Sequence, residues 1–294
     1  MSTRPVEFGL FLIPEADNYQ QLVELTAYAD ASGLDLIGVQ DHPYQRRFLD
    51  TWTLITTLAA QTTRVSLFPD VVNLPLRNPA VLAKAVASLD IISNGRIQLG
   101  LGAGAFWDAI AGMGGPRRTR GESVRALAEA IAVIRALWSD ERSVRVPGEF
   151  YALGGAHPGP RPRHNPGIWV GAKGPRMLEL TGRLADGWLP SAAWAPPAYL
   201  AAAGRRIDDA AAAAGRDPRT VRRVYNVSGT ITADGSDNGF LEGPPERWVE
   251  DLLALHRDQR VDGFVFWPTE GEPVEQIRRY TEQVVPAVRL GGGG

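Results

Sequence analysis

The chain has 294 residues, of which 44% are hydrophobic and 22% charged, and its formal net charge at pH 7 is −2. This balance is typical of a globular protein and argues against a basic surface for nucleic acid or anionic lipid. The absence of cysteine excludes disulfides, thiolate catalysis and cysteine-bound metals. The first apolar run is interrupted by Gly9 and ended by Pro14, so it is too short for a signal peptide or a membrane span. We therefore expect a cytoplasmic protein with no membrane contact.

Short apolar or β-branched segments alternate with amphipathic stretches along the whole chain. Strand character occurs in eight segments: residues 6–13, 34–40, 64–68, 96–102, 167–172, 186–190, 221–231 and 262–267. Helical spacing of apolar residues follows nearly every one, for example in residues 18–33, 78–93, 123–138, 175–185 and 274–288. Eight such units predict an α/β fold, a (β/α)8 TIM barrel, as one domain over residues 1–290 with a flexible glycine tail at 291–294. A doubly wound open sheet is the alternative, because alternation alone does not decide closure.

In such a barrel the functional residues lie in the loops that follow the strands. One of these loops contains Gly171, Ala172, Lys173 and Gly174 immediately before a predicted helix, and Arg176 adds a second positive charge. Free N–H groups at the start of a helix favour an anion such as phosphate. A plain tight turn is the alternative interpretation, but it does not need the two cationic residues. The loop therefore predicts a phosphate site.

A second glycine-rich loop follows the fourth predicted strand, in "LGLGAGAF". Gly102, Ala103 and Gly104 resemble part of a dinucleotide-binding motif, but the third glycine of that motif is missing. The match leaves a nicotinamide dehydrogenase on an open sheet as an alternative function. In a barrel, the small residues would let the side chain of a ligand run close to the backbone.

Asp41 and His42, after the second strand, are the best candidates for acid or base chemistry. A histidine there can exchange protons near pH 7, and the neighbouring carboxylate can orient it or help to hold a cofactor. A histidine bonded only to backbone is the alternative. The other histidines, His157, His164 and His256, do not form a ligand cluster, so no metal site is expected.

The third predicted strand is interrupted at Pro69 and Asp70 in "SLFPDVVNLPLRNPAVLAKAVASLD". This segment, its continuation to "LGLGAG", and "GIWVGAKGPRMLELTGRLADGWLPS" resemble the luciferase-like monooxygenase superfamily. That superfamily includes bacterial luciferase, flavin-dependent monooxygenases and enzymes that use the deazaflavin coenzyme F420. The resemblance extends over most of the chain and implies a TIM barrel that binds reduced FMN or F420 at the carboxyl end of its strands.

Site roles follow from the resemblance. It implies a bulge in the third strand with a non-prolyl cis bond at Asp70–Val71, where Asp70, Val71 and Val72 support the tricyclic ring. Gly102, Ala103 and Gly104 would line the cofactor's side chain, and Gly171, Ala172, Lys173, Gly174 and Arg176 would bind its phosphate. Asp41 and His42 match an Asp-His pair of some F420-dependent members, with His42 near the reactive ring carbon as proton donor or acceptor.

Five aromatic residues would form the substrate pocket or, alternatively, pack at the barrel rim: Phe11, Tyr44, Trp107, Trp194 and Trp267. The sugar-phosphate dehydrogenase branch has a glutamate after the fourth-strand glycines, where this chain has Ala105, which argues against that reaction.

The resemblance therefore predicts a flavin- or deazaflavin-dependent oxidoreductase that oxygenates a small organic substrate or transfers a hydride to or from it. It also implies a homodimer and a separate flavin or F420 reductase as a possible partner. A non-catalytic flavin-binding protein on the same fold is the alternative function.

Overall fold

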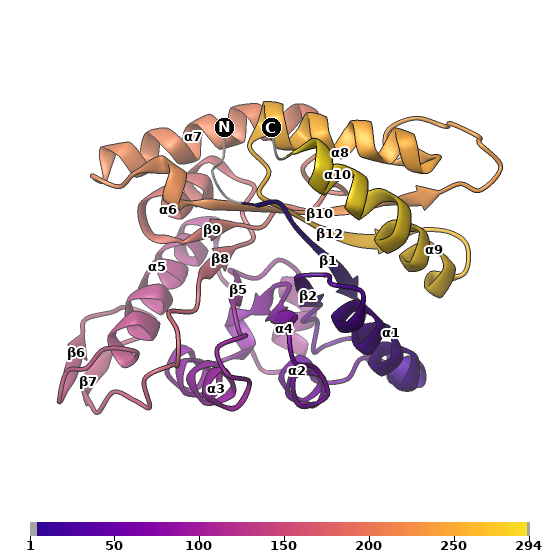
Figure 1. Ribbon diagram of the computed structural model, residues 1–294. Helices are drawn as coiled ribbons and strands as arrows, with labels where there is room; N and C mark the ends of the chain where they lie inside the picture. The colour runs from indigo at the N-terminus through magenta and orange to yellow at the C-terminus, as the bar shows by residue number, and fades with distance from the viewer. Residues whose placement is uncertain (1–4, 293–294) are drawn as a thin grey trace.

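A ring of parallel strands forms the centre of the computed structural model, which describes residues 5–292 (Figure 1). The strands of this ring are β1 (Glu7–Leu12), β2 (Leu36–Val39), β3 (Ser66–Pro69), β4 (Val72–Asn73), β5 (Leu99–Gly102), β8 (Ile168–Val170), β9 (Gly187–Trp188), β10 (Arg222–Ile231) and β12 (Gly263–Pro268). They follow the eight strand segments expected from the sequence, with β3 and β4 sharing the third position.

The interrupted third strand closes the ring. β3 pairs with β2 on one side, with Ile37 opposite Leu67, and β4 pairs with β5 on the other, with Val72 opposite Leu101. Hydrogen bonding then continues from β5 through β8, β9, β10, β12 and β1 back to β2. The predicted (β/α)8 barrel is therefore confirmed, and the open sheet is wrong because one strand position bonds to both neighbours.

Helices surround the ring and cover its outer face (Figure 1). They are α1 (Tyr19–Ala31), α2 (Thr51–Ala60), α3 (Pro79–Ile92), α4 (Trp107–Gly112), α5 (Arg120–Leu137), α6 (Pro175–Leu184), α7 (Pro197–Ala213), α8 (Pro245–Gln259), α9 (Pro273–Arg279) and α10 (Val285–Gly291). A π-helical turn, Tyr280–Val284, separates α9 from α10. Pro286 lies two positions after the end of this turn, and the wider turn fits a residue that has no N–H to donate.

Three short strands of the described chain lie outside the ring. An antiparallel pair, β6 (Val144–Val146) and β7 (Leu153–Ala156), is inserted between α5 and β8, and the short β11 (Glu242–Gly243) pairs with β10. Of the residues predicted to form a flexible glycine tail, Gly291 ends α10 and the Gly292 N–H donates to the Val288 carbonyl, while residues 293–294 lie outside the described part of the chain.

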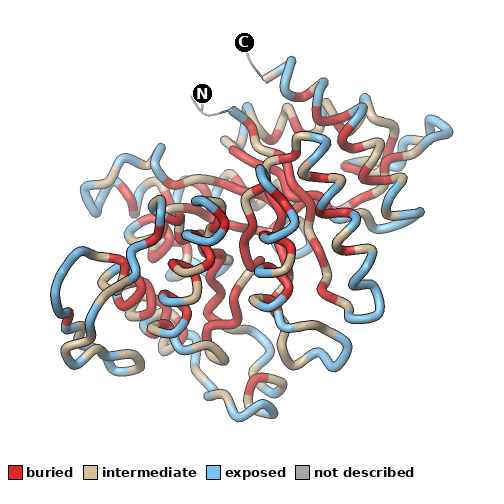
Figure 2. Tube along the Cα trace, turned by 60° about the horizontal axis from the view of Figure 1, so that its bottom comes forward, coloured by how far each residue is buried: buried red, intermediate tan, exposed pale blue. Residues whose placement is uncertain are grey.

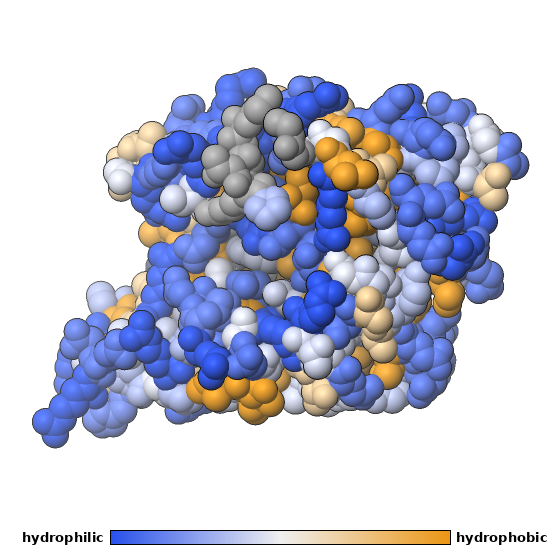
Figure 3. Space-filling view, in the orientation of Figure 1, coloured by the Kyte–Doolittle hydropathy of each residue, from blue (hydrophilic) through white to orange (hydrophobic). Residues whose placement is uncertain are grey.

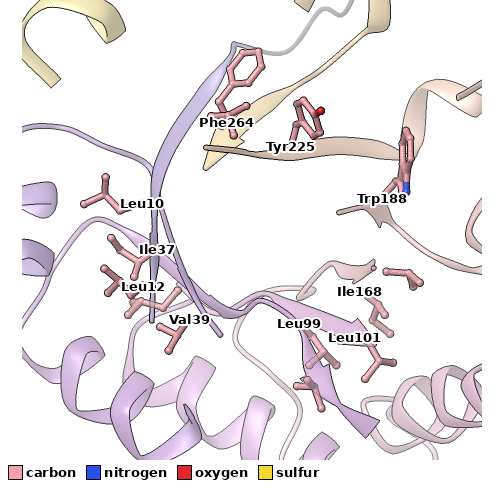
Figure 4. Close-up of a cluster of buried hydrophobic side chains, with 14 of the residues drawn as sticks. Leu10, Leu12, Ile37, Val39, Leu99, Leu101, Ile168, Trp188, Tyr225 and Phe264 are labelled. Atoms are coloured by element: carbon pink, nitrogen blue, oxygen red, sulfur yellow. The ribbon is translucent and has the colours of Figure 1, made fainter. Parts of the chain in front are cut away.

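Two hydrophobic clusters hold the barrel together. Outward-facing strand residues such as Leu10, Ile37 and Leu101 pack against the helices (Figure 4), and the tube view shows the strands buried while each helix buries one side (Figure 2). A separate cluster fills the inside of the barrel: Leu36, Phe68, Trp169, Leu189, Val224 and Val265. Alternation along each strand separates the two sets of side chains.

The amino end of the barrel is closed by charged and aromatic side chains. Arg222 pairs with Glu7, and its guanidinium carbon lies 5.5 Å from the centre of the Trp169 ring. Burial raises the pKa of Glu7, although the charge of Arg222 opposes that shift. The inner cluster and this ion pair leave the carboxyl end of the barrel, here named the mouth, as the end open to a ligand.

The surface in Figure 3 is mainly hydrophilic, with hydrophobic residues gathered over α3. Val81, Ile91 and Ile92 of that helix are 69%, 44% and 71% exposed. Exposed apolar residues on one outer helix are typical of contact surfaces between proteins. Among the residues that the structure describes, no helix is long and apolar enough to cross a membrane.

Candidate functional site at the mouth of the barrel

Residues Asp70 and Val71 form a bulge between β3 and β4, and the peptide bond that joins them is cis. The Asp70 N–H donates to the carbonyl of Val39 at 2.7 Å, so the bulge remains bonded to β2. The side chain of Val71 packs on the inner cluster, as does that of Phe11. The bulge therefore lies directly above the apolar filling of the barrel.

Glycines on neighbouring strands make room for Val71. A Cβ atom at Gly102 would lie 2.6 Å from one Val71 methyl carbon and 3.2 Å from the Val72 carbonyl oxygen. A Cβ atom at Gly171 would lie 3.2 Å from the same methyl carbon. Small residues at these two positions are therefore required by the bulge, whatever ligand it holds.

Gly102→Ala is expected to displace the bulge. Overpacking of this kind costs about 1 to 3 kcal/mol, and we expect a comparable loss in the free energy of unfolding. Gly112→Ala is the matched control, because nothing lies within 4 Å of a Cβ there and alanine favours the helix. Chemical denaturation checks the effect, and equal stability of the two variants would contradict the close packing of Val71.

Asp70 extends into the barrel from the bulge and is 9% exposed. Its Oδ1 accepts a hydrogen bond of 3.0 Å from Nδ2 of Asn226 on β10. Burial raises the pKa of Asp70 to about 7, and the Asn226 hydrogen bond opposes that shift. Asn226 was missed by the sequence analysis; the signal was an amide between Tyr225 and Val227 in a predicted strand.

Asp70→Asn is expected to stabilise the protein above pH 7. The pKa of Asp70 is about 7 in the folded protein and 3.8 ordinarily. Between these two values, the folded state keeps a proton on Asp70 that the unfolded state has lost. Stability of the native chain therefore falls between about pH 4 and pH 7, by up to about 4 kcal/mol, and the variant avoids this loss. Unfolding at pH 4 and pH 8 measures the difference. Asp258→Asn, at an exposed position, is the control, and equal pH profiles for both variants would contradict the prediction.

Asp41 is held in an ion pair that the sequence analysis did not predict. Arg77 donates from Nε to Asp41 Oδ2 at 2.8 Å and from Nη2 to Oδ1 at 2.7 Å, and the Asn73 N–H also donates to Oδ2. The Asp41 side chain is 1% exposed. Arg77 also reaches Asp50, the N-cap of α2, at 2.7 Å. This geometry favours a positioning role for Asp41 over proton transfer.

His42 lies half-buried between two aromatic rings. Its ring stacks on Tyr44 with centres 5.3 Å apart, and Phe106 meets it edge-on at 5.5 Å. Burial lowers the pKa of His42 below its ordinary value of 6.5, and the charge of Asp41 opposes that shift. A neutral imidazole therefore predominates at pH 7 and is able to accept a proton. Phe106, which is 48% exposed, was missed by the sequence analysis.

The five predicted pocket residues do not form one group. Phe11 and Trp267 stack with centres 5.4 Å apart, whereas Tyr44 belongs to the His42 group. Burial raises the pKa of the Tyr44 hydroxyl to about 12; Asn73 lies near this hydroxyl, but their geometry makes no hydrogen bond. Trp107 begins α4 and lies close to Gly104, where a Cβ would be 3.0 Å from its ring.

Trp194 differs from the other four aromatic residues. It is 64% exposed in the loop after β9, and it has no ring partner among residues 5–292. The structure therefore gives no support to a pocket wall at this position.

The loop between β8 and α6 presents unbonded donors. Within the described chain, the backbone N–H groups of Lys173, Gly174 and Arg176 donate no hydrogen bond, and Gly174 caps α6 without a side-chain bond. The indole of Trp188 donates to the Ala172 carbonyl at 2.9 Å, and the Tyr199 hydroxyl donates to the Lys173 carbonyl. These two bonds, which the sequence did not predict, fix a loop suited to an anion.

The side chain of Arg176 lies in a different place from the free N–H groups of this loop. Its side chain borders a surface groove of about 450 Å³ between α5, α6 and α7, together with Val124 and Arg183. A second hollow of about 380 Å³ lies near the amino end of the barrel, beside Trp138 and Asp186. Both lie away from the bulge and His42. No group of acidic or histidine side chains suited to a metal ion occurs among residues 5–292.

Comparison with known proteins gives the family. The family described as luciferase-like monooxygenase matches residues 6–238, which is most of the chain. The chain belongs to the luciferase-like monooxygenase family. A 5,10-methylenetetrahydromethanopterin reductase from Archaeoglobus fulgidus is 31% identical over 231 residues, which cover 78% of this chain. The match covers 65% of that relative, so the chain spans less than two thirds of its length.

Other known proteins match over nearly the whole chain. An F420-dependent glucose-6-phosphate dehydrogenase from Microbacterium testaceum is 30% identical over 303 residues, covering 95% of this chain and 89% of the relative. The oxygenating constituent of 3,6-diketocamphane monooxygenase from Pseudomonas putida, solved with FMN, superposes with a TM-score of 0.79 at 18% identity, covering 96% and 98% of the two chains. The predicted family and fold are thus confirmed, and both cofactor types occur among the proteins it resembles.

Proposed function

We propose that this chain is an F420-dependent oxidoreductase that transfers a hydride between the deazaflavin and a small organic substrate. The observation that carries the proposal is the arrangement at the mouth of the barrel. There the bulge at residues 70–71 lies on the apolar filling, between Gly102 and Gly171 and beside the neutral His42. The name of the Microbacterium testaceum relative favours F420 over FMN, because that match covers 95% of this chain.

The residues present fit a flat ring with a phosphate-bearing side chain. Asp70 Oδ2, Asn226 Oδ1, Asn73 Oδ1 and the Tyr44 hydroxyl are buried near the bulge without hydrogen-bond partners among the described residues. Such atoms are costly to bury unless a ligand or water bonds them. The free N–H groups of residues 173, 174 and 176 supply the donors that a phosphate needs.

When bound, the cofactor supplies the hydride acceptor or donor, and the chain supplies position and proton transfer. We assign to Asp70, Val71 and Val72 the support of the ring, to Gly102, Ala103 and Gly104 the passage of its side chain, and to residues 171–174 its phosphate. His42 would accept the proton of an alcohol oxygen in oxidation, or deliver a proton to a ketone oxygen or an alkene carbon in reduction. Asp41, fixed by Arg77, sets the position of the His42 backbone.

The reacting substrate is a small alcohol, ketone or activated alkene held by Phe11, Tyr44, Trp107 and Trp267. We do not extend the glucose-6-phosphate substrate to this chain, because Ala105 has no carboxylate. The same proposal includes a homodimer, for which the apolar side chains exposed on α3 would provide a contact surface. It also includes a separate reductase as partner and a cytoplasmic location.

A paired titration with F420 and FMN, each oxidised and reduced and followed by fluorescence, tests the proposal. We expect F420 to bind at micromolar concentration or tighter and FMN to bind at least tenfold more weakly. Preference for reduced FMN would replace hydride transfer with an oxygen-using monooxygenase. Tight F420 binding without turnover of any alcohol, ketone or alkene would favour the non-catalytic alternative, and binding of neither ligand would overturn the proposal.

A further inference from the structure

The hydrogen bond between Asp70 and Asn226 crosses the barrel. The order around the ring is β3, β2, β1, β12, β10 in one direction and β4, β5, β8, β9, β10 in the other. The two residues therefore project from strand positions that lie opposite each other. Phe68 and Val224, two residues earlier on the same strands, belong to the apolar filling. The Asp70–Asn226 pair thus forms a polar floor immediately above that filling.

Both side chains of this floor keep an unbonded acceptor. Asp70 Oδ2 and Asn226 Oδ1 are buried and have no hydrogen-bond partner within residues 5–292. Space for the carboxyl group comes from Gly38 on β2, where a Cβ would lie 2.9 Å from Asp70 Oδ2. A side chain at position 38 would therefore displace the very atom that lacks a partner.

Among residues 5–292, no strong charge acts on Asp70 from the surrounding elements. The loop after β2 carries Asp41, which Arg77 neutralises, and the neutral His42, while Tyr44 stays protonated. β1 and β12 contribute Phe11 and Trp267, and β5 and β8 contribute glycines. Burial and the Asn226 hydrogen bond therefore govern the protonation of Asp70, and its pKa of about 7 follows from them.

We propose that Asp70 and Asn226 recognise the N–H edge of the ring that binds at the mouth, and that ring binding releases the proton of Asp70. The inference rests on the proposed function. A ring N–H that donates to Oδ2 stabilises the carboxylate and competes with its protonation. Affinity must then rise with pH until Asp70 is ionised, by about tenfold between pH 6 and pH 8.

The test is a titration of the whole protein with oxidised F420 and with FMN at pH 6, 7 and 8, compared with Asp70→Asn. For each ligand, we compare the dissociation constant of the native protein with that of Asp70→Asn. We expect the ratio of these two constants to change about tenfold over this pH range, because the asparagine does not ionise. The ring's own ionisation affects both proteins equally and cancels in the ratio. Asp258→Asn, which removes an exposed carboxylate, should follow the native profile.

Asn226→Ala separates recognition from a merely structural role. Loss of its hydrogen bond removes the one contact that lowers the Asp70 pKa, so the midpoint of the pH profile should move to higher pH. Calorimetry in two buffers of different ionisation enthalpy should show proton release at pH 6.5 for the native chain and not for Asp70→Asn. Equal pH profiles for native chain and Asp70→Asn would overturn the inference and leave the proposed function standing. Failure of both ligands to bind any of these proteins would overturn both.

Discussion

Arg77→Ala is expected to lower the free energy of unfolding by about 3 to 5 kcal/mol, because it leaves the buried carboxylate of Asp41 without its cation. One bond from the Asn73 N–H would remain to that carboxylate. The same change frees the loop that carries His42, so turnover should fall with stability. Urea denaturation at pH 7 measures the first effect.

Two variants test whether the ion pair itself is responsible. Arg77→Lys keeps the charge but cannot bond both carboxylate oxygens in the same way, so an intermediate loss is expected. Arg77→Ala combined with Asp41→Asn removes the unpaired buried charge and should recover part of the stability. A loss below 1 kcal/mol for Arg77→Ala, as for a surface pair, would contradict the structural role given to Asp41.

His42→Ala is expected to lower turnover by about 10²- to 10⁴-fold, the range for loss of a general acid or base, while F420 affinity stays within about threefold. Burial lowers the pKa of His42 below its ordinary value of 6.5, so the imidazole is neutral at pH 7, and the rate of alcohol oxidation should fall only at the lower pH where the ring becomes protonated and cannot accept the alcohol proton. Steady-state rates with the best alcohol, at saturating oxidised F420, check both statements.

His42→Gln is the matched control for the shape of this side chain, because glutamine forms hydrogen bonds but does not exchange protons near pH 7. Its turnover should be as low as that of the alanine variant. Native turnover in either variant would remove the acid–base role and leave His42 as a packing partner of Tyr44 and Phe106.

Strand positions and the break in the third strand could be read from local sequence pattern, whereas the bulge at that break was implied by the family resemblance. Apolar runs bounded by Gly, Pro or Asp predicted each strand position of the ring, and Pro69 and Asp70 indicated where the third strand breaks. The glycine-rich loops were also local features. Their role in accommodating Val71 was not, because it depends on three strands meeting at the mouth.

Pairings between distant residues could not be predicted. Arg77 lies 36 positions from Asp41, and Asn226 lies 156 positions from Asp70, so only the closed ring brings each pair together. The exposure of individual side chains could not be predicted either. Trp194 occurs in a loop after a barrel strand, as a pocket residue would, but its side chain is 64% exposed. Side-chain direction, rather than element type, was the missing information.

A crystal structure of the protein with F420 is the most direct measurement of the central claim, which is that the mouth binds a flavin-type ring. The account predicts the ring above Asp70 and Val71, with one face towards His42 and its phosphate on the N–H groups of residues 173, 174 and 176. A ring bound in the groove between α5, α6 and α7, or a phosphate held away from the loop before α6, would contradict it.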